Sequence, residues 1–327
     1  MIKFRRVRKG DLSRIREVIE AAYADFYERQ LGSRPRQVFG GAQYVHHRWL
    51  MEPWGCYVAE ENESKIVGAS IAVCWGSVGL FGPLAVLTPF QNQKVAQGLL
   101  KATQAFFDEN GVTLQGVATY PYSPKHLVLY QKFGYKPKGL VVVTSKALDR
   151  PDSPAAVARP ALKPGLAVRR YSTLEEARKK QVMQKVRRIT NGFWRGLDLA
   201  KEIEIVDGLT LGDTLLLEKG REVIGFAVCH LPPNSEAPHG SAYVKLLAID
   251  SRHRKPEHLQ ALLQGVEEMA SAGQLQRVVV PAYTYYWTAY QALLERGYHV
   301  DFTMVRMKRG KQEDYEDASD LVLDDWR

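Results

Sequence analysis

The stretch Leu84-Ala-Val-Leu-Thr-Pro-Phe-Gln-Asn-Gln-Lys-Val-Ala-Gln-Gly-Leu-Leu100 decides the fold of this 327-residue chain. An apolar run from Val78 to Leu87 predicts a strand that enters a short polar turn and then a helix. The helix is indicated by apolar side chains at helical spacing: Leu99, Leu100, Thr103, Phe106 and Phe107. The first N–H groups of a helix lack internal partners and carry the positive end of its dipole. The turn therefore predicts an anion-binding site.

The polar turn matches neither common phosphate-binding motif. A P-loop needs Gly-x-x-x-x-Gly-Lys-Ser/Thr and a dinucleotide fold needs Gly-x-Gly-x-x-Gly, and the sequence contains neither. The order Gln91-x-x-Lys94-x-Ala96 instead resembles the pyrophosphate loop of the GNAT superfamily of N-acetyltransferases, whose usual form is Gln/Arg-x-x-Gly-x-Gly/Ala. Gln91 and Ala96 match this form, whereas Lys94 occupies the first glycine position.

A second block about thirty residues later strengthens the resemblance. Ser123-Pro-Lys-His-Leu-Val-Leu-Tyr-Gln-Lys-Phe-Gly-Tyr135 is similar to the family segment Asn-x-x-Ala-x-x-Leu-Tyr-x-x-x-Gly-Phe/Tyr. Ser123 replaces the asparagine and His126 replaces the small residue, while Tyr130 keeps the family's tyrosine position.

The elements expected around these blocks follow the GNAT order. Phe4 to Val7 reads as a strand, and Asp11 is a plausible N-cap for the helix that follows. Tyr57 to Glu60 and Ile66 to Cys74 predict a hairpin, and Thr113 to Thr119 predicts a strand between the two blocks.

The second half of the chain repeats the first. Ile66-Val-Gly-Ala-Ser-Ile-Ala-Val-Cys74 recurs as Val223-Ile-Gly-Phe-Ala-Val-Cys229, and Gly134-Tyr135 recurs as Gly297-Tyr298. The period has the size of a domain, which indicates duplication rather than a solenoid. The resemblance to tandem GNAT proteins, such as the mycothiol synthase type, thus covers nearly all of the chain.

This resemblance implies an α/β fold with a mixed (α+β) sheet, arranged as two tandem GNAT domains. We expect an N-terminal domain over residues 1–148, a Pro-rich linker over 149–164 and a degenerate C-terminal domain over 165–327. The C-terminal domain ends in an acidic tail whose last residues, 321–327, either dock as an edge strand or stay solvated.

The two copies differ at the loop. The second half reads Arg252-His-Arg-Lys-Pro-Glu257, where Pro256 removes a backbone donor and Glu257 places a carboxylate at the helix N-terminus. Leu293 aligns with Tyr130, so this copy also lacks the phenol. Its three cations, Arg252, Arg254 and Lys255, remain able to contact phosphates from outside. We therefore expect the first half to hold the working site.

The resemblance also implies the site residues. Twelve residues are expected to bind acetyl-CoA, the acyl donor: Leu84, Ala85, Val86, Gln91, Asn92, Gln93, Lys94, Val95, Ala96, Ser123, His126 and Tyr130. Tyr130 is the expected catalytic residue, because a phenol stays protonated at neutral pH and suits donation to the departing thiolate. The alternative is a helix residue packed under the sheet.

Two of these residues have open roles. Lysine at position 94 gives up the conformational freedom of glycine but offers an ammonium to an anion, unless it is only a solvated surface residue. His126 either faces the thioester or packs.

The general base cannot be read from spacing. Candidates lie on segments that flank the expected cleft, and none is favoured: Glu60, His46, His47, Tyr120 and Tyr122. No His, Cys or carboxylate cluster has ligand spacing along the chain, so no metal is expected.

The predicted function is acyl-CoA-dependent N-acyltransfer. An acetyl group would pass from acetyl-CoA to a primary amine of a small molecule or peptide, by direct attack in a ternary complex. The alternative is a non-catalytic acyl-CoA-binding or regulatory protein that retains the fold.

The charge distribution agrees with an anionic cofactor. Residues 1–150 hold 20 Lys/Arg and 12 Asp/Glu, whereas residues 151–327 hold 25 and 24. The basic residues are scattered without interleaved aromatic residues, which disfavours nucleic acid as the partner.

The composition predicts a cytoplasmic protein, monomeric or homodimeric. Met1 to Arg6 shows no secretory signal, and no apolar run approaches the ~20 residues that cross a bilayer. The three cysteines form no even framework, as expected for reduced thiols.

Overall fold

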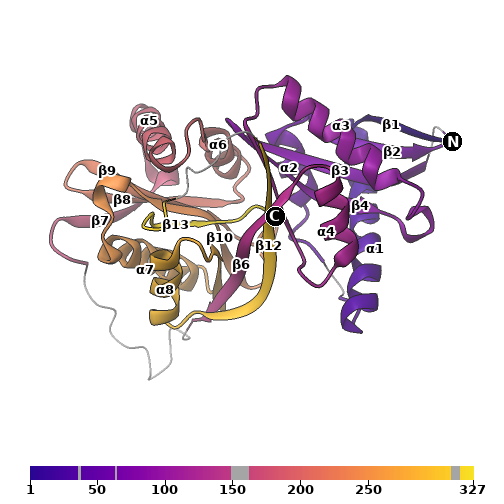
Figure 1. Ribbon diagram of the computed structural model, residues 1–327. Coiled ribbons are helices and arrows are strands. Elements are labelled where there is room, and N and C mark those ends of the chain that lie inside the picture. The colour runs from indigo at the N-terminus through magenta and orange to yellow at the C-terminus, as the bar shows by residue number, and fades with distance from the viewer. Residues whose placement is uncertain (36–37, 63–64, 149–161, 311–316) are drawn as a thin grey trace.

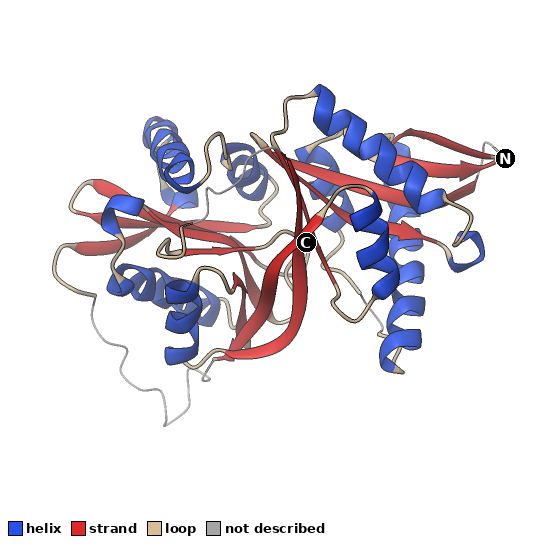
Figure 2. Ribbon diagram, viewed as in Figure 1, coloured by secondary structure: helices blue, strands red, loops and turns tan. Residues whose placement is uncertain are grey.

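The computed structural model describes residues 1–35, 38–62, 65–148, 162–310 and 317–327, which form one mixed α/β structure around a 13-stranded sheet (Figures 1 and 2). Among these residues, no helix combines the length and apolar character needed to cross a bilayer.

The first half contributes ten regular elements. In chain order these are β1 (Ile2–Arg6), α1 (Leu12–Leu31), α2 (Tyr44–Met51), β2 (Tyr57–Glu61), β3 (Lys65–Trp75), β4 (Val78–Val86), α3 (Val95–Glu109), β5 (Leu114–Thr119), α4 (Pro124–Lys132) and β6 (Lys136–Ala147).

The second half repeats this order element for element and then adds one strand. Its elements are β7 (Leu166–Arg170), α5 (Glu176–Phe193), α6 (Ala200–Gly208), β8 (Gly212–Lys219), β9 (Glu222–His230), β10 (Ser241–Ile249), α7 (Pro256–Ala272), β11 (Arg277–Tyr283), α8 (Trp287–Glu295), β12 (His299–Gly310) and β13 (Val322–Asp324). The glycines that precede β6 and β12 also agree, since Gly134 and Gly297 have φ values of 84° and 86°. This repetition confirms the predicted tandem fold.

The two halves exchange their last strands. The sheet order is β1-β2-β3-β4-β5-β12-β6-β11-β10-β9-β8-β7, so β12 lies between β5 and β6, and β6 lies between β12 and β11. Figure 1 shows β6 and β12 side by side between the halves. The halves therefore share one continuous sheet, although the chain passes between them through 149–164. Most of that segment, 149–161, lies outside the described residues, and the division there stays a prediction.

Helices cover both faces of the strands in the first half. The helix α1 buries Ile15 and Ile19 against the face that carries Ala85, whereas α3 buries Val95 and Leu99 against the face that carries Val86. Successive residues of a strand point to opposite faces, which accounts for this division. The side chains of α3 predicted from helical spacing are all buried.

Asp11 occupies the N-cap position of α1 but does not cap the helix with its side chain. Its backbone is already helical, with φ −83° and ψ −17°, whereas a capping residue is normally extended. The carboxylate instead accepts hydrogen bonds of 2.7 Å from the Arg5 guanidinium and the Arg8 backbone N–H. Asp11 therefore occupies the predicted N-cap position, but the prediction that its side chain caps the helix is wrong.

Neighbouring strands part in both halves. The strands β4 and β5 pair in parallel only where Val78–Leu80 faces Leu114–Gly116. In the second half, β10 and β11 pair only where Ser241–Tyr243 faces Arg277–Val279. In each half the strand before the loop, β4 or β10, is therefore not paired with β5 or β11 along the rest of that edge.

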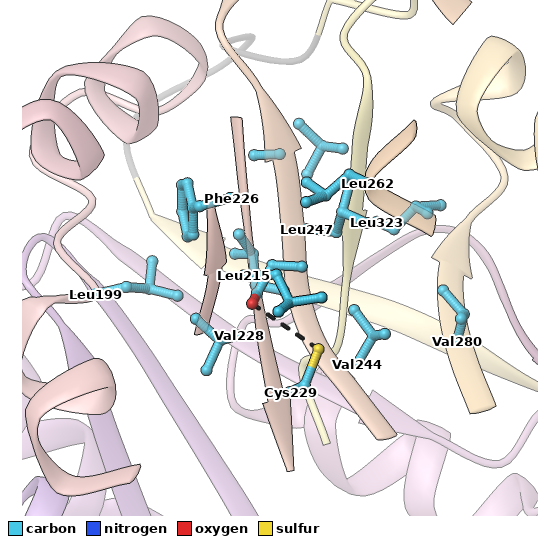
Figure 3. Close-up of a cluster of buried hydrophobic side chains, with 14 of the residues drawn as sticks. Leu199, Leu215, Phe226, Val228, Cys229, Val244, Leu247, Leu262, Val280 and Leu323 are labelled. Carbon is cyan, nitrogen blue, oxygen red and sulfur yellow. Dashed lines mark hydrogen bonds between the residues drawn. The ribbon is translucent and has the colours of Figure 1, made fainter. Parts of the chain in front are cut away.

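In the second half, β13 fills this gap. It pairs antiparallel with Leu246–Ala248 of β10, whose other edge is occupied by β9. Leu323 of β13 lies beside Leu247 and Leu262 in the buried core (Figure 3). Of the two alternatives for residues 321–327, the structure shows docking as a strand: β13 pairs with β10, and the side chains of Leu321, Val322 and Leu323 are buried. Residues 311–316, which include the acidic Glu313, Asp314 and Glu316, lie outside the described residues.

A buried ion pair anchors β13. Arg306 of β12 is fully buried and donates a 2.5 Å hydrogen bond to Asp324. Its guanidinium carbon lies 4.0 Å from the ring centroids of both Tyr283 and Trp326, and Trp326 donates a 2.8 Å hydrogen bond to Asp324.

We predict that Asp324→Ala destabilises the protein by about 3–5 kcal/mol, because the Arg306 guanidinium loses its carboxylate in a buried site. Urea unfolding midpoints, compared at equal slope, measure this loss. Asp317→Ala is the control and should change the midpoint little, because solvent screens its pair with Arg254. Equal midpoint shifts in the two variants would contradict a special role for the buried pair.

Candidate active site

A cleft opens in the first half where β4 and β5 part. It forms a cavity of about 620 Å³ between β4, the turn before α3, and α4. Eleven of the twelve predicted cofactor residues line this cavity. The exception is Gln93, whose side chain turns away and donates a 2.9 Å hydrogen bond to the Pro89 carbonyl. The structure thus brings the residues of the two sequence blocks together, while their binding role stays a prediction.

The turn before α3 presents a row of unpaired backbone amides. Gly98 is the first residue of the helix whose N–H is bonded, to the Lys94 carbonyl at 3.0 Å. Within the described chain, the amides of residues 92–97 donate no backbone hydrogen bond of normal geometry. These amides lie beside the cavity, so the expected anion-binding arrangement is present.

Lys94 adopts the backbone conformation of the glycine that it replaces. Its φ of 63° and ψ of 10° lie in the left-handed region, as does the φ of 63° at Asn92. This conformation costs a lysine roughly 1–2 kcal/mol relative to a right-handed one. The expectation that lysine gives up this geometry is therefore wrong, since the turn keeps its shape and adds an exposed ammonium at its rim.

The lining of this cavity is cationic. Among the described residues, four basic ones and no acidic one line it: Arg29, Lys94, Lys125 and Lys132. Lys125 donates a 3.1 Å hydrogen bond to the Gln91 side chain, which in turn donates to the Val86 carbonyl at 3.0 Å. Burial, and then the charge of Arg29, lower the pKa of Lys125. The arrangement suits a ligand with several negative charges.

Sequence reasoning did not single out Arg29 or Lys125 as site residues. Lys125 lies within the quoted 123–135 block, so its position beside the loop was available as a signal. Arg29 comes from α1, whose approach to the cleft depends on tertiary packing.

A second cavity of about 380 Å³ adjoins the first. The two cavities share four lining residues, Tyr23, Leu84, His126 and Tyr130. Beyond them, the second cavity is closed by residues of the other half, including Tyr243, Glu236 and Phe302. A ligand in one cavity can therefore meet a ligand in the other beside Tyr130.

Tyr130 lies where the two cavities meet, and its phenol is protonated at neutral pH. Burial raises the pKa of its phenol above the usual range. The hydroxyl makes no hydrogen bond to any other described residue. Tyr130 therefore presents a protonated phenol beside both cavities, and its role as a proton donor stays a prediction.

His126 is held neutral at the same junction. Its ring stacks on Phe26, with centroids 5.1 Å apart and an interplanar angle of 25°. Burial and the neighbouring Lys125 charge lower the pKa of His126 to about 4. The imidazole is thus uncharged at neutral pH, and it both packs and faces the cavities.

Four of the five candidate bases are not among the residues that line the two cavities: Glu60, His46, His47 and Tyr122. Glu60 pairs with Arg5 at 2.9 Å. His47 is buried 2.9 Å from Glu202. Tyr120 does line the smaller cavity, where its hydroxyl is hydrogen-bonded to the hydroxyl of Tyr27.

The charged groups of the smaller cavity are fixed by internal pairing. Glu236 accepts from Arg48 at 2.7 Å and from Lys245 at 2.9 Å. Asp325 pairs with Arg327 at 2.8 Å. Burial alone would raise the pKa of Asp325, but Arg327 and Lys245 outweigh burial and hold it at about 2. These groups therefore keep their charges across the neutral range.

The corresponding position in the second half is closed. Besides the insertion of β13, two of its three loop cations, Arg252 and Arg254, pair with carboxylates of the same half. Arg252 pairs with Asp250 at 2.7 Å, and Arg254 pairs with Asp317 and Asp320 at 2.8 and 2.5 Å. The helix α7 begins at Pro256, with Glu257 in its first turn, as the sequence indicates. The open cleft described above belongs to the first half.

Comparison with known proteins agrees with this geometry. Residues 52–137 match the acetyltransferase (GNAT) domain family. No curated protein sequence matches the chain.

Solved structures share the fold over nearly the whole chain. A putative acetyltransferase from Pyrococcus horikoshii has a TM-score of 0.69 and 14% identity, covering 99% of this chain and 95% of that one. A GCN5-related N-acetyltransferase from Sphaerobacter thermophilus has a TM-score of 0.62 and 15% identity, covering 94% and 95%.

A tandem GNAT protein from the clavulanic acid biosynthesis pathway has a TM-score of 0.56 and 11% identity, covering 96% of this chain and 100% of that one. This fold supports acyl-CoA-dependent N-acyltransfer in general. Residues 52–137 thus match a GNAT acetyltransferase domain, and the chain as a whole has a fold similar to that of a tandem GNAT protein.

Proposed function

We propose that the protein transfers an acetyl group from acetyl-CoA to a primary amine of a small molecule or peptide. The observation that carries this proposal is the junction of the two cavities at Tyr130. The larger cavity, with its unpaired amides and cationic rim, suits the diphosphate and pantetheine of coenzyme A. The smaller cavity is left for the acceptor.

In this reaction the amine attacks the thioester carbonyl directly. A C–N bond forms, the C–S bond breaks, and the sulfur leaves as a thiolate that takes a proton from the Tyr130 hydroxyl. The neutral amine carries the attacking electron pair, and its nitrogen releases one proton once the C–N bond has formed. This proton, passed through water, restores the Tyr130 phenol, so the products are the amide and the coenzyme A thiol. The edge of β4 from Leu84 to Val86 would hold the pantetheine, since this edge has no neighbouring strand.

Thiol release tests the proposal. Acetyl-CoA is incubated with the protein and a panel of amines, and free coenzyme A thiol is measured against time. Thiol release that depends on the amine supports acyl transfer. If acetyl-CoA raises the Tm but no amine releases thiol, the protein is a non-catalytic acyl-CoA binder.

We predict that Tyr130→Phe lowers kcat by about 10²–10⁴-fold, because the leaving thiolate loses its proton donor. Coenzyme A affinity should stay unchanged, since the ring and its packing remain. The matched control is Tyr135→Phe, which removes another buried hydroxyl that donates to Gln115 at 3.1 Å. Normal turnover by Tyr130→Phe would remove the phenol from the mechanism.

We predict that Lys94→Glu abolishes the rise in Tm that coenzyme A produces, because it reverses a charge on the cationic rim. Lys255→Glu is the matched control, since Lys255 precedes the first residue of α7 as Lys94 precedes that of α3. This variant should keep the full rise. The opposite pattern would place the cofactor in the second half.

We predict that kcat shows no descending limb between pH 7 and about 9.5. A proton donor loses activity as the pH rises through its pKa, and burial places the pKa of Tyr130 above its usual value of about 10. The profile is measured at saturating acetyl-CoA and amine. A fall in kcat centred near pH 8 would show that Tyr130 is not the donor or that its pKa is lowered.

A further inference from the structure

A group of metal-ligand side chains meets where the two halves of the chain join. His47 comes from α2 in the first half, and Glu202 and His230 come from α6 and β9 in the second. One ligand atom from each lies within 4.8 Å of the other two. Each side chain is at most 1% exposed, and none of the three lines the cavities of the candidate active site.

Both histidines direct the same type of atom at one carboxylate oxygen. The Nε2 atom of His47 lies 2.9 Å from Oε1 of Glu202, and the Nε2 atom of His230 lies 3.2 Å from that oxygen. For a tetrahedral zinc ion with bonds of about 2.0–2.1 Å, neighbouring ligand atoms are separated by about 3.3 Å. The two measured separations are close to this value.

The hydrogen bonding of His47 is incomplete. Both of its ring nitrogens are buried without a hydrogen bond of normal geometry, although Nε2 lies only 2.9 Å from Glu202. The Nε2 atoms of His47 and His230 both approach Oε1 of Glu202. In such a shared arrangement a nitrogen can come close to the oxygen without the alignment that a hydrogen bond needs. A buried polar side chain without such a bond is unusual, and it points to a missing partner.

Trp75 and Glu236 lie beside the remaining polar atoms of the cluster, where the outer-shell partners of a metal site would lie. The second Glu202 oxygen, Oε2, accepts a 3.2 Å hydrogen bond from the Trp75 indole. The second His47 nitrogen, Nδ1, lies 3.5 Å from a Glu236 oxygen. Ligand histidines and carboxylates commonly use their remaining atoms in this way, which fixes their orientation.

We propose that Nε2 of His47, Oε1 of Glu202 and Nε2 of His230 bind a divalent transition metal ion, zinc foremost. Two imidazoles and one carboxylate form a ligand set that zinc accepts. The ion would connect α2 to α6 and β9. It would thereby hold the position of Arg48, the next residue of α2, whose pair with Glu236 lines the smaller cavity. This inference does not depend on the proposed acyl transfer.

An imidazolium at His47 is the competing arrangement. Burial alone would lower the pKa of His47, but Glu202 and Glu236 outweigh burial and raise it to about 9. A metal ion requires neutral imidazoles, so its binding would displace this proton. The two arrangements therefore exclude each other, and metal content distinguishes them.

The first measurement is the metal content of the full-length protein, purified without chelator or metal-affinity resin. Elemental analysis should find about one zinc per chain. Removal of the metal with a chelator should lower the Tm, and added Zn²⁺ or Co²⁺ should restore it through mass action. Co²⁺ bound at this site should also give visible absorption bands, a readout independent of activity.

Variants locate the ion. Glu202→Gln and His230→Gln should each lose the bound zinc, and His46→Gln is the matched control. His46 lies beside His47 on the same helix, where it hydrogen-bonds to Gln43 instead of the cluster. Loss of zinc from the control together with the two variants would place the ion elsewhere.

The wild-type protein decides the question even if the variants fail to fold. The inference is overturned if the purified protein holds no metal and the chelator-treated protein takes none from a chromophoric indicator loaded with Zn²⁺, Co²⁺ or Mn²⁺. The Tm response to coenzyme A is measured on the same samples. A protein that responds to coenzyme A but binds no metal would refute the metal site alone.

Discussion

The parting of β4 from β5 beyond Leu80 is the constraint on which the candidate site depends. Backbone N–H and C=O groups need hydrogen-bond partners when water is excluded. A strand edge inside a sheet that lacks a partner therefore costs free energy. The duplicated chain meets this requirement in two ways. In the second half β13 supplies the missing neighbour of β10, whereas in the first half the edge of β4 faces a cavity. The same local geometry is thus filled by a strand in one copy and opens onto a cavity in the other.

The exchange of β6 and β12 makes the smaller cavity a product of both halves. Because β12 pairs with β5 and β6, its Phe302 and Met304 lie opposite Val143 and Val141 of β6 and line this cavity together with Tyr120. Glu236 and Tyr243 approach from the second half and meet Arg48 from α2. A domain that lacked its partner's strand would have neither this wall nor the buried pairs that fix its charges. The degenerate copy therefore contributes to the site without holding a cleft of its own.

Sequence reasoning reached what depends on local periodicity and spacing. The strand, turn and helix around residues 84–100 follow from hydrophobic pattern, and eleven of the twelve expected cofactor residues share one cavity. The strand exchange was not predictable, because pairing between β6 and β11 depends on contacts between segments far apart in the chain. The cluster of His47, Glu202 and His230 was missed for the same reason. The left-handed backbone of Lys94 was also missed, because the residue type argues against the conformation that the turn imposes.

The uneven charge of the chain has a structural explanation in these two loops. The cations at the first loop line an open cavity that no acidic residue of the described ranges lines, so their field is available to an anionic ligand. The cations at the second loop, Arg252 and Arg254, already pair with Asp250, Asp317 and Asp320. Two of these carboxylates belong to the segment that leads into β13. The same stretch of chain thus closes the second cleft with its strand and neutralises the second loop with its acidic side chains. The basic first half thus holds the open cleft, and the nearly neutral second half holds the cleft that β13 fills.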